Sequence, residues 1–266
     1  MSDRSDRSLH DWWYHACGLT EVDADDSWLS DAEAERIASF RFEKRRSETR
    51  MSRWTAKCAS ARALGFPVDE WIRDRPAELR HIGIRNRSSG APEVFVDGEP
   101  AGVSISMTDR ADWAVCVVTP DAAVAVGCDL ELVEPRTAGF VADWFTPAER
   151  AIVAADAAAS HDLLANLIWS AKESALKVLQ TGLRRDTRSV EVQLGADGAV
   201  DGWQPLTVTS LDDSDDGAVF TGWWQQFGQF VLSCATDAPL DPPRPVTEPP
   251  PLATATPAHA WLDTIR

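Results

Sequence analysis

Residues 169 to 177 read Trp169-Ser170-Ala171-Lys172-Glu173-Ser174-Ala175-Leu176-Lys177, and residues 126 to 131 upstream read Val126-Gly127-Cys128-Asp129-Leu130-Glu131. On a helix, Glu173 and Lys177 are one turn apart and share one face. On a strand, Asp129 and Glu131 alternate with their neighbours and also share one face. Three carboxylates and one ammonium group that converge on a point suit a magnesium ion holding a phosphate ester. Together, the two segments predict a strand and a helix that meet at a phosphate-binding site.

Each segment alone also has an ordinary structural interpretation. Asp-x-Glu is common on solvated strand faces, although the apolar residues around it here indicate a buried strand. Glu173 and Lys177 can form a routine helix salt bridge, which contributes only about 0.2–0.5 kcal/mol. Lys172 is offset by about a hundred degrees around the helix and is expected to face elsewhere. Trp169 is expected to be a core residue.

The composition is that of a globular chain, with 44% apolar and 26% charged residues among 266. The five cysteines show no paired spacing, which argues against a disulfide framework and a zinc site and favours a reducing compartment. The N-terminus lacks an apolar signal region, and no apolar run approaches the roughly 20 residues that a membrane helix needs. We therefore expect a cytoplasmic protein with no membrane contact.

The net charge of −16 argues against nucleic-acid binding, which needs a broad positive surface. The charge is uneven, however, because residues 41–62 hold eight Lys or Arg against two Glu. Such a run is either a solvated helix face or a local anion site on an otherwise acidic protein. The sequence leaves both interpretations open.

Capping and turn residues predict where the main helices begin and end. Ser30 to Glu33 forms a capping box at the start of one helix, and Thr146 to Glu149 forms another. A longer helix is expected over residues 43–64, closed by Gly65, and the helix with the key motif over residues 162–180. A loop is expected at 86–92, and strands are expected at residues 93–96, 103–107, 113–118, 123–132, 189–194, 206–210, 218–224 and 230–235.

Helices followed by strands, twice over, predict an α+β fold of two similar halves that meet near residues 115–120, although no residue-level repeat is evident. The expected organisation is an N-terminal segment at 1–28, halves at 29–117 and 118–237, and a proline-rich C-terminal tail at 238–266. Residues 238–257 lack periodicity and are expected to form an extended tail or linker. The final residues, 260–265, are apolar enough in part that this segment could pack against the rest of the protein.

These motifs resemble those of the Sfp-type 4′-phosphopantetheinyl transferases. That family has a Gly-x-Asp-x-Glu strand, then about forty residues later a helix with Trp-x-x-Lys-Glu-Ala/Ser-x-x-Lys, followed by a glycine-containing turn and a strand. The matching segments here are, in order, Gly127 to Glu131, Phe145 to Glu149 (the family's Phe-x-x-x-Glu helix start), Trp169 to Lys177, Thr181-Gly182-Leu183, and Ser189 to Val192. The resemblance spans roughly residues 32–235.

The resemblance implies a pseudo-dimer of two α+β halves within one monomeric chain, with coenzyme A bound in the cleft between them. Such enzymes transfer the 4′-phosphopantetheine arm of coenzyme A to a serine of an apo acyl or peptidyl carrier protein and release 3′,5′-ADP. By position, Asp129, Glu131 and Glu173 would hold Mg²⁺, with Mn²⁺ as a substitute. Glu173 would act as general base, and Lys177 would contact the phosphates. The two-half form also implies a role in secondary metabolism.

Two departures from the family pattern affect the coenzyme site. The usual Gly-Lys-Pro reads Gly90-Ala91-Pro92, and the histidine of the usual Ser-His-Ser-Gly is Met107. Arg110 is the hypothesised replacement for the missing phosphate contact, with an ordinary surface position as the alternative; Arg85 and Arg87 are further cations near the loop. The positions expected to bind coenzyme A are Lys44, Lys57, Gly90, Pro92, Ser106, Met107, Arg110 and Lys177.

Two other functions stay open on the sequence. One is a non-catalytic coenzyme A or carrier-protein binding member of the same fold, although three converging acids argue against it. The other is a magnesium-dependent phosphohydrolase of unrelated fold, which explains the carboxylates but not the Trp-x-x-Lys-Glu helix. Carrier proteins present acidic helices, so the local basic run would matter more for that partner than the overall negative charge.

Overall fold

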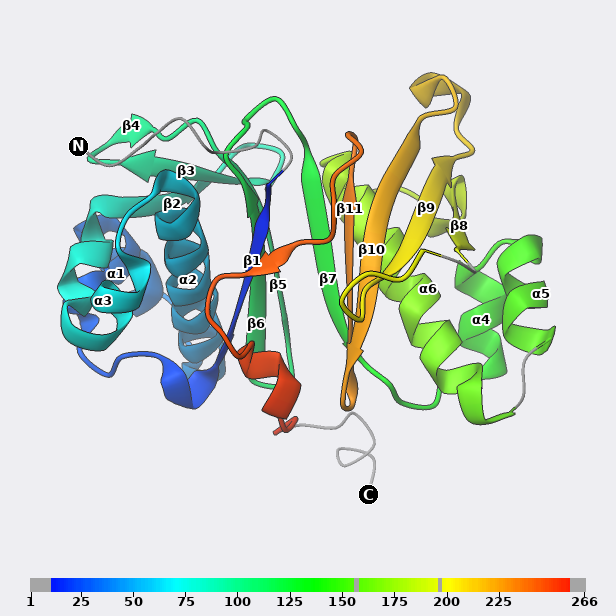
Figure 1. The fold of residues 1–266 in the computed structure, drawn as a ribbon, viewed down its shortest axis with the longest axis horizontal. Coiled ribbons are helices and arrows are strands. Elements are labelled where there is room, and N and C mark those ends of the chain that lie inside the picture. Colours follow the sequence, from blue (N-terminus) through cyan, green and yellow to red (C-terminus); the bar gives the residue numbers. More distant parts are fainter. Residues whose placement is uncertain (1–10, 156–157, 196–197, 259–266) are drawn as a thin grey trace.

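The computed structural model describes residues 11–155, 158–195 and 198–258 (Figure 1). They form a mixed α+β fold in which the main sheets occupy the middle and helices cover the two outer sides. The predicted fold class is confirmed at that level. Residues 260–265, for which the sequence allowed docking onto the body, lie outside the described residues.

The first set of elements, called the first half below, spans residues 13–119. Its main sheet joins β1 (Trp13–Gly18), β6 (Trp113–Thr119) and β5 (Ser104–Arg110), antiparallel and in that order. A smaller sheet contains β2 (Ile82–Asn86), β3 (Pro92–Val96) and β4 (Glu99–Pro100). The helices are α1 (Asp31–Ala38), α2 (Glu43–Leu64) and α3 (Val68–Asp74), and α2 packs on β1 and β6.

The second half spans residues 126–236. Its antiparallel sheet has the order β7 (Val126–Leu132), β11 (Phe230–Thr236), β10 (Val219–Phe227), β9 (Gln204–Ser210) and β8 (Val190–Leu194). The helices are α4 (Ala138–Trp144), α5 (Pro147–Ala155) and α6 (Ala158–Val178). The longest of them, α6, packs on β7 and β11.

Three apolar clusters hold these layers together. One packs α2 against the first sheet, and another packs α6 against the second sheet. The third contains Tyr14 of β1, Val117 of β6, Leu130 of β7 and Phe230 of β11, all buried. Because this third cluster draws on strands of both sheets, the two halves share one core.

The predicted helix ends agree well with the structure. The long helix α2 begins and ends at the predicted residues, and Gly65 closes it with a φ of 78° in the left-handed region. Both capping boxes form, at Ser30 and at Thr146. The sequence does not predict β1, β2, α3 or α4. Both faces of β1 are buried, so it lacks polar alternation; it lies in the predicted 1–28 segment but belongs to the first sheet.

A buried Lys–Glu ion pair occurs at the same place in each half. In the first half, Lys57 Nζ on α2 lies 2.7 Å from Glu33 Oε2 in the capping box of α1. In the second half, Lys172 Nζ on α6 lies 2.8 Å from Glu149 Oε2 in the capping box of α5. Both lysine side chains have 0% exposure. Each pair therefore joins a short helix to the long helix that follows it.

Backbone groups complete the hydrogen bonding of both pairs. Glu33 Oε1 accepts from Ile84 N at 3.1 Å, and Glu149 Oε1 accepts from Val192 N at 2.8 Å. Each lysine ammonium also donates to two backbone carbonyls. A buried ion pair is tolerated when such bonds satisfy both charges. The pair thus fixes two helices and a strand relative to one another.

The matching pairs identify a residue-level repeat in the sequence. Trp54-Thr55-Ala56-Lys57 on α2 corresponds to Trp169-Ser170-Ala171-Lys172 on α6, and residues 28–33 correspond to residues 144–149. In both halves two tryptophans meet edge to face, with ring centroids 5.1 Å and 5.7 Å apart. The strand order β1-β6-β5 also corresponds to β7-β11-β10. The interpretation that no such repeat is evident is therefore corrected.

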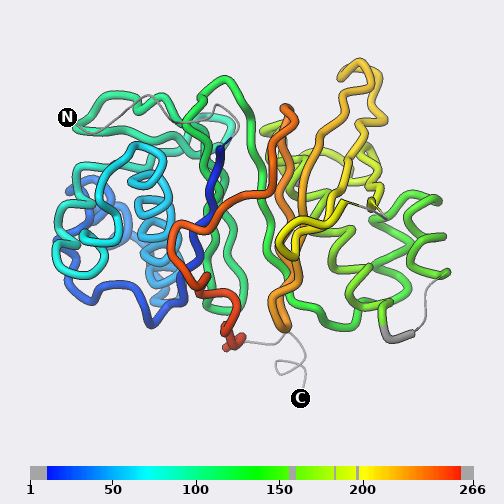
Figure 2. Tube along the Cα trace, in the orientation of Figure 1, coloured from blue at the N-terminus to red at the C-terminus, as the bar shows by residue number. Residues whose placement is uncertain are grey.

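The proline-rich segment is a packed strap rather than a free tail. This C-terminal strap, residues 238–258, runs from the end of β11 across to the first sheet (Figure 2). There β12 (Arg244–Pro245) pairs in parallel with β1. Leu240, Val246 and Leu252 are buried, and the Trp223 indole donates to the Leu240 carbonyl at 2.9 Å. The segment is extended, as expected for a tail or linker, but apolar residues between its prolines anchor it to the body.

Replacing Lys172 with methionine is expected to destabilise the fold by about 3–5 kcal/mol, since Glu149 is left buried without its cation. Urea unfolding at neutral pH measures the change. Arg188→Ala is the matched control, because this exposed arginine pairs with the exposed Asp186 and its loss should leave the urea midpoint unchanged. An unchanged midpoint for Lys172→Met would show that the pair does not hold the fold.

Candidate functional site

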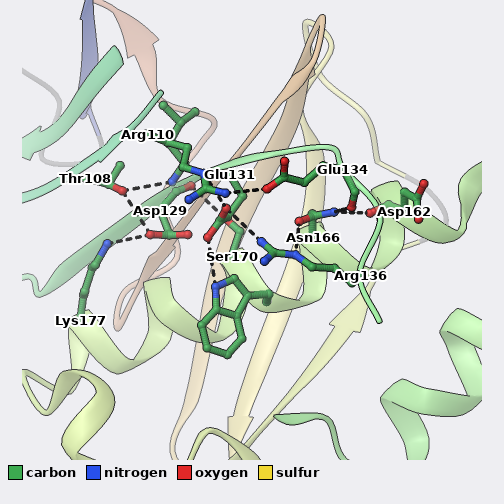
Figure 3. Close-up of polar contacts among 12 residues, drawn as sticks. Thr108, Arg110, Asp129, Glu131, Glu134, Arg136, Asp162, Asn166, Ser170 and Lys177 are labelled. Carbon is green, nitrogen blue, oxygen red and sulfur yellow. Dashed lines mark hydrogen bonds and ion pairs between the residues drawn. The ribbon is translucent and has the colours of Figure 1, made fainter. Parts of the chain in front are cut away.

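Asp129 and Lys177 form a direct ion pair where β7 meets α6 (Figure 3). Lys177 Nζ lies 2.9 Å from Asp129 Oδ1 and donates to the Cys128 carbonyl at 2.7 Å. Thr108 of β5 donates to the same Asp129 oxygen at 3.1 Å. The other oxygen, Oδ2, is buried and has no hydrogen-bond partner among the described residues. Burial alone would lower the pKa of Lys177, but Asp129, Cys128 and Glu173 together outweigh burial and raise that pKa.

Glu131, the second acid of the strand motif, faces Arg110 and Arg136 (Figure 3) and also contacts the Trp169 indole. Its Oε2 lies 3.1 Å from Arg136 and 3.3 Å from Arg110, and its Oε1 accepts from the Trp169 indole at 3.1 Å. Burial and the charge of Asp129 raise the pKa of Glu131 to about 7, against the opposing effect of the arginines. Both carboxylates of the motif therefore contact residues of α6, in agreement with the strand period.

Glu173 lies on α6 one turn before Lys177 and is partly buried. Burial and the charge of Asp129 raise its pKa to about 7; Glu131 adds to this shift and Lys177 opposes it. The three predicted acids thus share one electrostatic environment. Within the described ranges, however, no three acidic, histidine or cysteine side chains already stand in metal-binding geometry. The site is a group of neighbouring acids rather than a closed metal cage.

Gly127 allows α6 to approach β7 closely enough to bring these groups together. A Cβ atom at this position would lie 1.9 Å from the Ser174 carbonyl oxygen, so only glycine fits. Ser170 of α6 adds a hydrogen bond from its hydroxyl to the Asp129 carbonyl at 2.8 Å. The glycine of the motif is therefore explained by packing of the helix on the strand.

Hydroxyl groups of β5 join the two halves beside the acids. Ser106 Oγ accepts from Cys128 N at 3.1 Å, and Thr108 Oγ1 accepts from Leu130 N at 3.3 Å. Because β5 and β7 belong to different sheets, these side chains replace the backbone bonds of a sheet. Ser106, predicted to bind coenzyme A, therefore also has a structural contact.

A pocket of about 810 Å³ lies next to the acids and draws its walls from both halves. The β2–β3 loop and β5 line one side, and the segment before β7 and the end of α6 line the other. The cations in its lining are Arg87, Lys177 and Arg184, and among the described residues no carboxylate lines it. Lys177 belongs to both the pocket and the ion pair with Asp129. On a chain of net charge −16, this pocket is locally positive.

Some of the positions predicted to bind coenzyme A do not reach this pocket. Lys57 is fully buried in its pair with Glu33, so the structure contradicts its predicted ligand contact. Lys44 is exposed and lies 3.8 Å from Glu48, outside the pocket lining. The predicted positions that do line the pocket are Gly90, Pro92, Ser106, Met107 and Lys177.

Arg110 also has other partners. It lies 2.6 Å from Glu134 and 3.3 Å from Glu131, and it is absent from the pocket lining. Two acids hold this side chain beside β7, so its role as a replacement for the missing phosphate contact stays a prediction. It is a partner of the acid group rather than a wall of the pocket.

The sequence interpretation missed Arg184 and Arg53. Arg184 lines the pocket and donates to the Ser89 carbonyl at 2.8 Å, which links its two sides. Arg53 Nη1 lies 4.0 Å from the sulfur of Met107, the position where the resemblance leads one to expect histidine. The signal for Arg184 was its place directly after the glycine turn at Gly182. Arg53 had no local signal, since it sits within the basic run.

Residues 125–224 match the family model described as the 4′-phosphopantetheinyl transferase superfamily. The matched stretch contains Asp129, Glu131, Glu173 and Lys177, and it supports a transferase at the level of that superfamily. Among solved structures, holo-ACP synthase from Plasmodium yoelii is similar over 42% of this chain and 93% of its own, at 12% identity and a TM-score of 0.32. No curated protein matches the sequence significantly. None of the helices in the described part of the chain is long and apolar enough to span a bilayer.

Replacing Gly127 with alanine is expected to destabilise the protein by about 1–3 kcal/mol, because the new methyl group forces α6 away from β7. A thermal melt followed by circular dichroism measures the loss. Gly139→Ala is the control, since an added Cβ there meets its nearest neighbour at 3.8 Å. Equal melting temperatures for Gly127→Ala and the native chain would contradict the packing role.

Proposed function

We propose that this protein is an Sfp-type 4′-phosphopantetheinyl transferase. It moves the phosphopantetheine arm of coenzyme A to a serine of an apo acyl or peptidyl carrier protein and releases 3′,5′-ADP. The observation that carries the proposal is the position of Lys177, which lines the pocket and pairs with Asp129. A phosphate ester bound in the pocket would contact the Lys177 ammonium group, which itself contacts the acid Asp129. The family match over residues 125–224 supports the same conclusion.

The pocket suits a ligand with several phosphate groups. Its volume of about 810 Å³ lies within the ~300–1,000 Å³ usual for small-molecule sites. Guanidinium groups bind phosphate oxygens through paired hydrogen bonds, so Arg87 and Arg184 are suited to the coenzyme phosphates. They compensate for the lysine and histidine that the family pattern would place at Ala91 and Met107.

Asp129, Glu131 and Glu173 are the residues that would hold a divalent cation, Mg²⁺ or Mn²⁺. The buried Asp129 oxygen without a partner fits a cation ligand, and carboxylate oxygens are the donors that Mg²⁺ prefers. The raised pKa values of Glu131 and Glu173 fit acids whose mutual repulsion a cation would relieve. When bound, such an ion offsets the negative charge of the pyrophosphate.

Glu173 and Lys177 have separate roles in the transfer: Glu173 accepts the serine proton, and Lys177 stabilises the leaving phosphate. The serine oxygen bonds to the phosphorus that carries pantetheine, and the bond from that phosphorus to the 3′,5′-ADP oxygen breaks. The serine proton passes to the Glu173 carboxylate, which acts as general base. Lys177, kept in its ammonium form by Asp129, donates a hydrogen bond to the leaving phosphate oxygen.

The repeated scaffold supports the pseudo-dimer that the resemblance implies. Strand order, capping boxes and buried Lys–Glu pairs correspond between the halves, and residues of both line the pocket. On this proposal a single chain acts as a monomer, binds coenzyme A between its halves, and modifies carrier proteins of secondary metabolism. Neither nucleic acid nor membrane takes part.

Intact-mass spectrometry of an apo carrier protein, incubated with this protein, coenzyme A and Mg²⁺, tests the proposal. A phosphopantetheine mass gain is expected, and EDTA should remove it. Glu173→Gln is expected to slow transfer by about 10²–10⁴-fold, the usual contribution of a general base. Glu35→Gln changes an exposed carboxylate on α1 and is the matched control, with an unchanged rate.

Other outcomes would redirect the assignment. Coenzyme A binding without a mass gain on any of several carrier classes would support the non-catalytic member of the same fold. Full activity of Glu173→Gln would overturn its role as base. Cleavage of pyrophosphate esters without an acceptor protein would favour the phosphohydrolase.

Replacing Arg184 with alanine is expected to raise KM for coenzyme A by about tenfold or more, since a hydrogen bond from a charged group contributes about 1.5–3 kcal/mol. The value of kcat should change little, because the hydrogen bonds of Arg184 go to the Ser89, Gln180 and Thr181 carbonyls and not to the acids. Steady-state transfer rates measure both constants. Arg188→Ala, an exposed arginine outside the pocket, is the control; equal KM values for the two variants would remove Arg184 from the site.

A further inference from the structure

Arg136 lies in the loop between β7 and α4 and contacts Glu131, one of the three acids of the site (Figure 3). Its Nη2 donates to Glu131 Oε2 at 3.1 Å. The Arg136 side chain is 17% exposed, so this ion pair is largely shielded from water. Arg136 belongs to neither of the two motifs that carry the acids. Its contact with Glu131 is therefore a property of the fold.

Asn166 of α6 fixes the orientation of the Arg136 guanidinium group (Figure 3). This asparagine is fully buried, and its Oδ1 accepts from Arg136 Nε at 2.6 Å. Its Nδ2 donates to the backbone carbonyls of Glu134 at 2.7 Å and Asp162 at 2.8 Å. The amide oxygen and both amide hydrogens thus have partners, which leaves the side chain a single orientation. Arg136 is in turn held by a group that cannot turn away from it.

The Phe140 ring supports the same guanidinium group from one face. The Arg136 guanidinium carbon lies 4.8 Å from the ring centroid of Phe140. The Phe140 ring also packs edge to face on Trp169, with centroids 5.1 Å apart. The Trp169 indole donates to Glu131 Oε1 at 3.1 Å. One ring therefore supports a partner of each Glu131 oxygen.

Glu131 is held by both of its carboxylate oxygens, unlike Asp129. Oε2 faces Arg136 and, at 3.3 Å, Arg110, while Oε1 faces Trp169. Asp129 keeps one buried oxygen that has no hydrogen-bond partner among the described residues. A carboxylate oxygen has more than one lone pair, so it can accept a hydrogen bond and still ligate a cation. Glu131 can therefore be fixed in orientation and remain a metal ligand.

We propose that Arg136, held by Asn166, is a positioning residue that orients Glu131 for a divalent cation. This inference rests on the proposed function in one respect, namely that the three acids bind such an ion. Groups that hydrogen-bond a ligating carboxylate set its direction, and their loss usually weakens metal binding about 10–100-fold. A simple effect of charge has the opposite sign, because a guanidinium group repels a cation. Experiment can therefore separate the two effects.

Isothermal titration calorimetry of the full chain with MnCl₂, without coenzyme A or carrier protein, tests this proposal. Arg136→Ala is expected to bind Mn²⁺ about 10–100-fold more weakly than the native chain. Arg136→Lys should not restore the affinity, since lysine keeps the charge but lacks the planar set of N–H groups that reaches Asn166 and Glu131 together. Asp129→Asn should abolish binding, which assigns the ion to the acids. The matched control, Arg188→Ala, removes an exposed arginine elsewhere and should bind Mn²⁺ as the native chain does.

A double-mutant cycle tests the link through Asn166. Asn166→Ala is expected to weaken Mn²⁺ binding about tenfold. Added to Arg136→Ala it should weaken binding no further, because Asn166 acts through the guanidinium group. Urea unfolding shows whether each variant is folded at the temperature of the titration. If the buried position does not tolerate Asn166→Ala, the two Arg136 variants decide the question alone.

Several results would overturn the proposal. They are native or tighter Mn²⁺ affinity in Arg136→Ala, restored affinity in Arg136→Lys, additive losses in the cycle, and Mn²⁺ binding that survives Asp129→Asn. Absence of Mn²⁺ binding by the native chain would overturn it as well. Failure of the proposed function has a different signature, which is Mn²⁺ binding with the expected losses but no phosphopantetheine mass gain on a carrier protein. In that case the role of Arg136 stands and the reaction at the acids is another one.

Discussion

The orientation of the long helix in each half depends on a buried ion pair with a glutamate at the start of the preceding helix. Taking two charges out of water costs several kcal/mol per ion, so the pair persists only where other groups complete its hydrogen bonds. Lys172 and Glu149 meet this condition through backbone groups near β8. With Lys172 fixed in the core, α6 cannot rotate about its axis. The next residue, Glu173, is turned by about 100°, and its charge interacts with the acids of β7. Gly127 then sets the distance between helix and strand.

The acidic group on β7 and the positively charged lining of the pocket adjoin each other at Lys177. The negative charge of the β7 acids is partly neutralised by arginines on a neighbouring strand and loop, since Glu131 lies within ion-pair distance of Arg110 and Arg136. The pocket has cations and no described carboxylate in its lining. Lys177 stands at the boundary between the two regions. An anionic ligand is thus attracted to the pocket in spite of the net charge of the chain, because local fields act over distances of roughly a Debye length, ~8–10 Å.

Local sequence signals predicted those parts of the fold that local physics determines. Capping boxes and the closing glycine placed α1, α2 and α5, and alternation or apolar runs placed most strands. Strand β1 escaped because both of its faces are buried, and the C-terminal strap escaped because its anchoring residues are spaced between prolines. The acids of the site were predicted from their spacing. The partners of Lys57 and Arg110 were not, since each is held by a residue distant in the sequence or on another strand. The repeat Trp-Thr/Ser-Ala-Lys was visible in the sequence but became evident through the contacts of its lysines.

The repeat also bears on how many ligands one chain can hold. After the shared lysine, α6 continues with Glu173 and, four residues later, Lys177, whereas α2 continues with Cys58 and Arg62. Cys58 is a buried thiol, and Arg62 donates to the Val246 carbonyl of the C-terminal strap at 2.6 Å. The first half therefore has the neutral Cys58 at the position where the second half has the acid Glu173. The C-terminal strap covers this part of the first half, where it contacts Arg62. On the proposed function, the two scaffolds would therefore provide a single reaction centre, and one polypeptide would carry one transferable coenzyme.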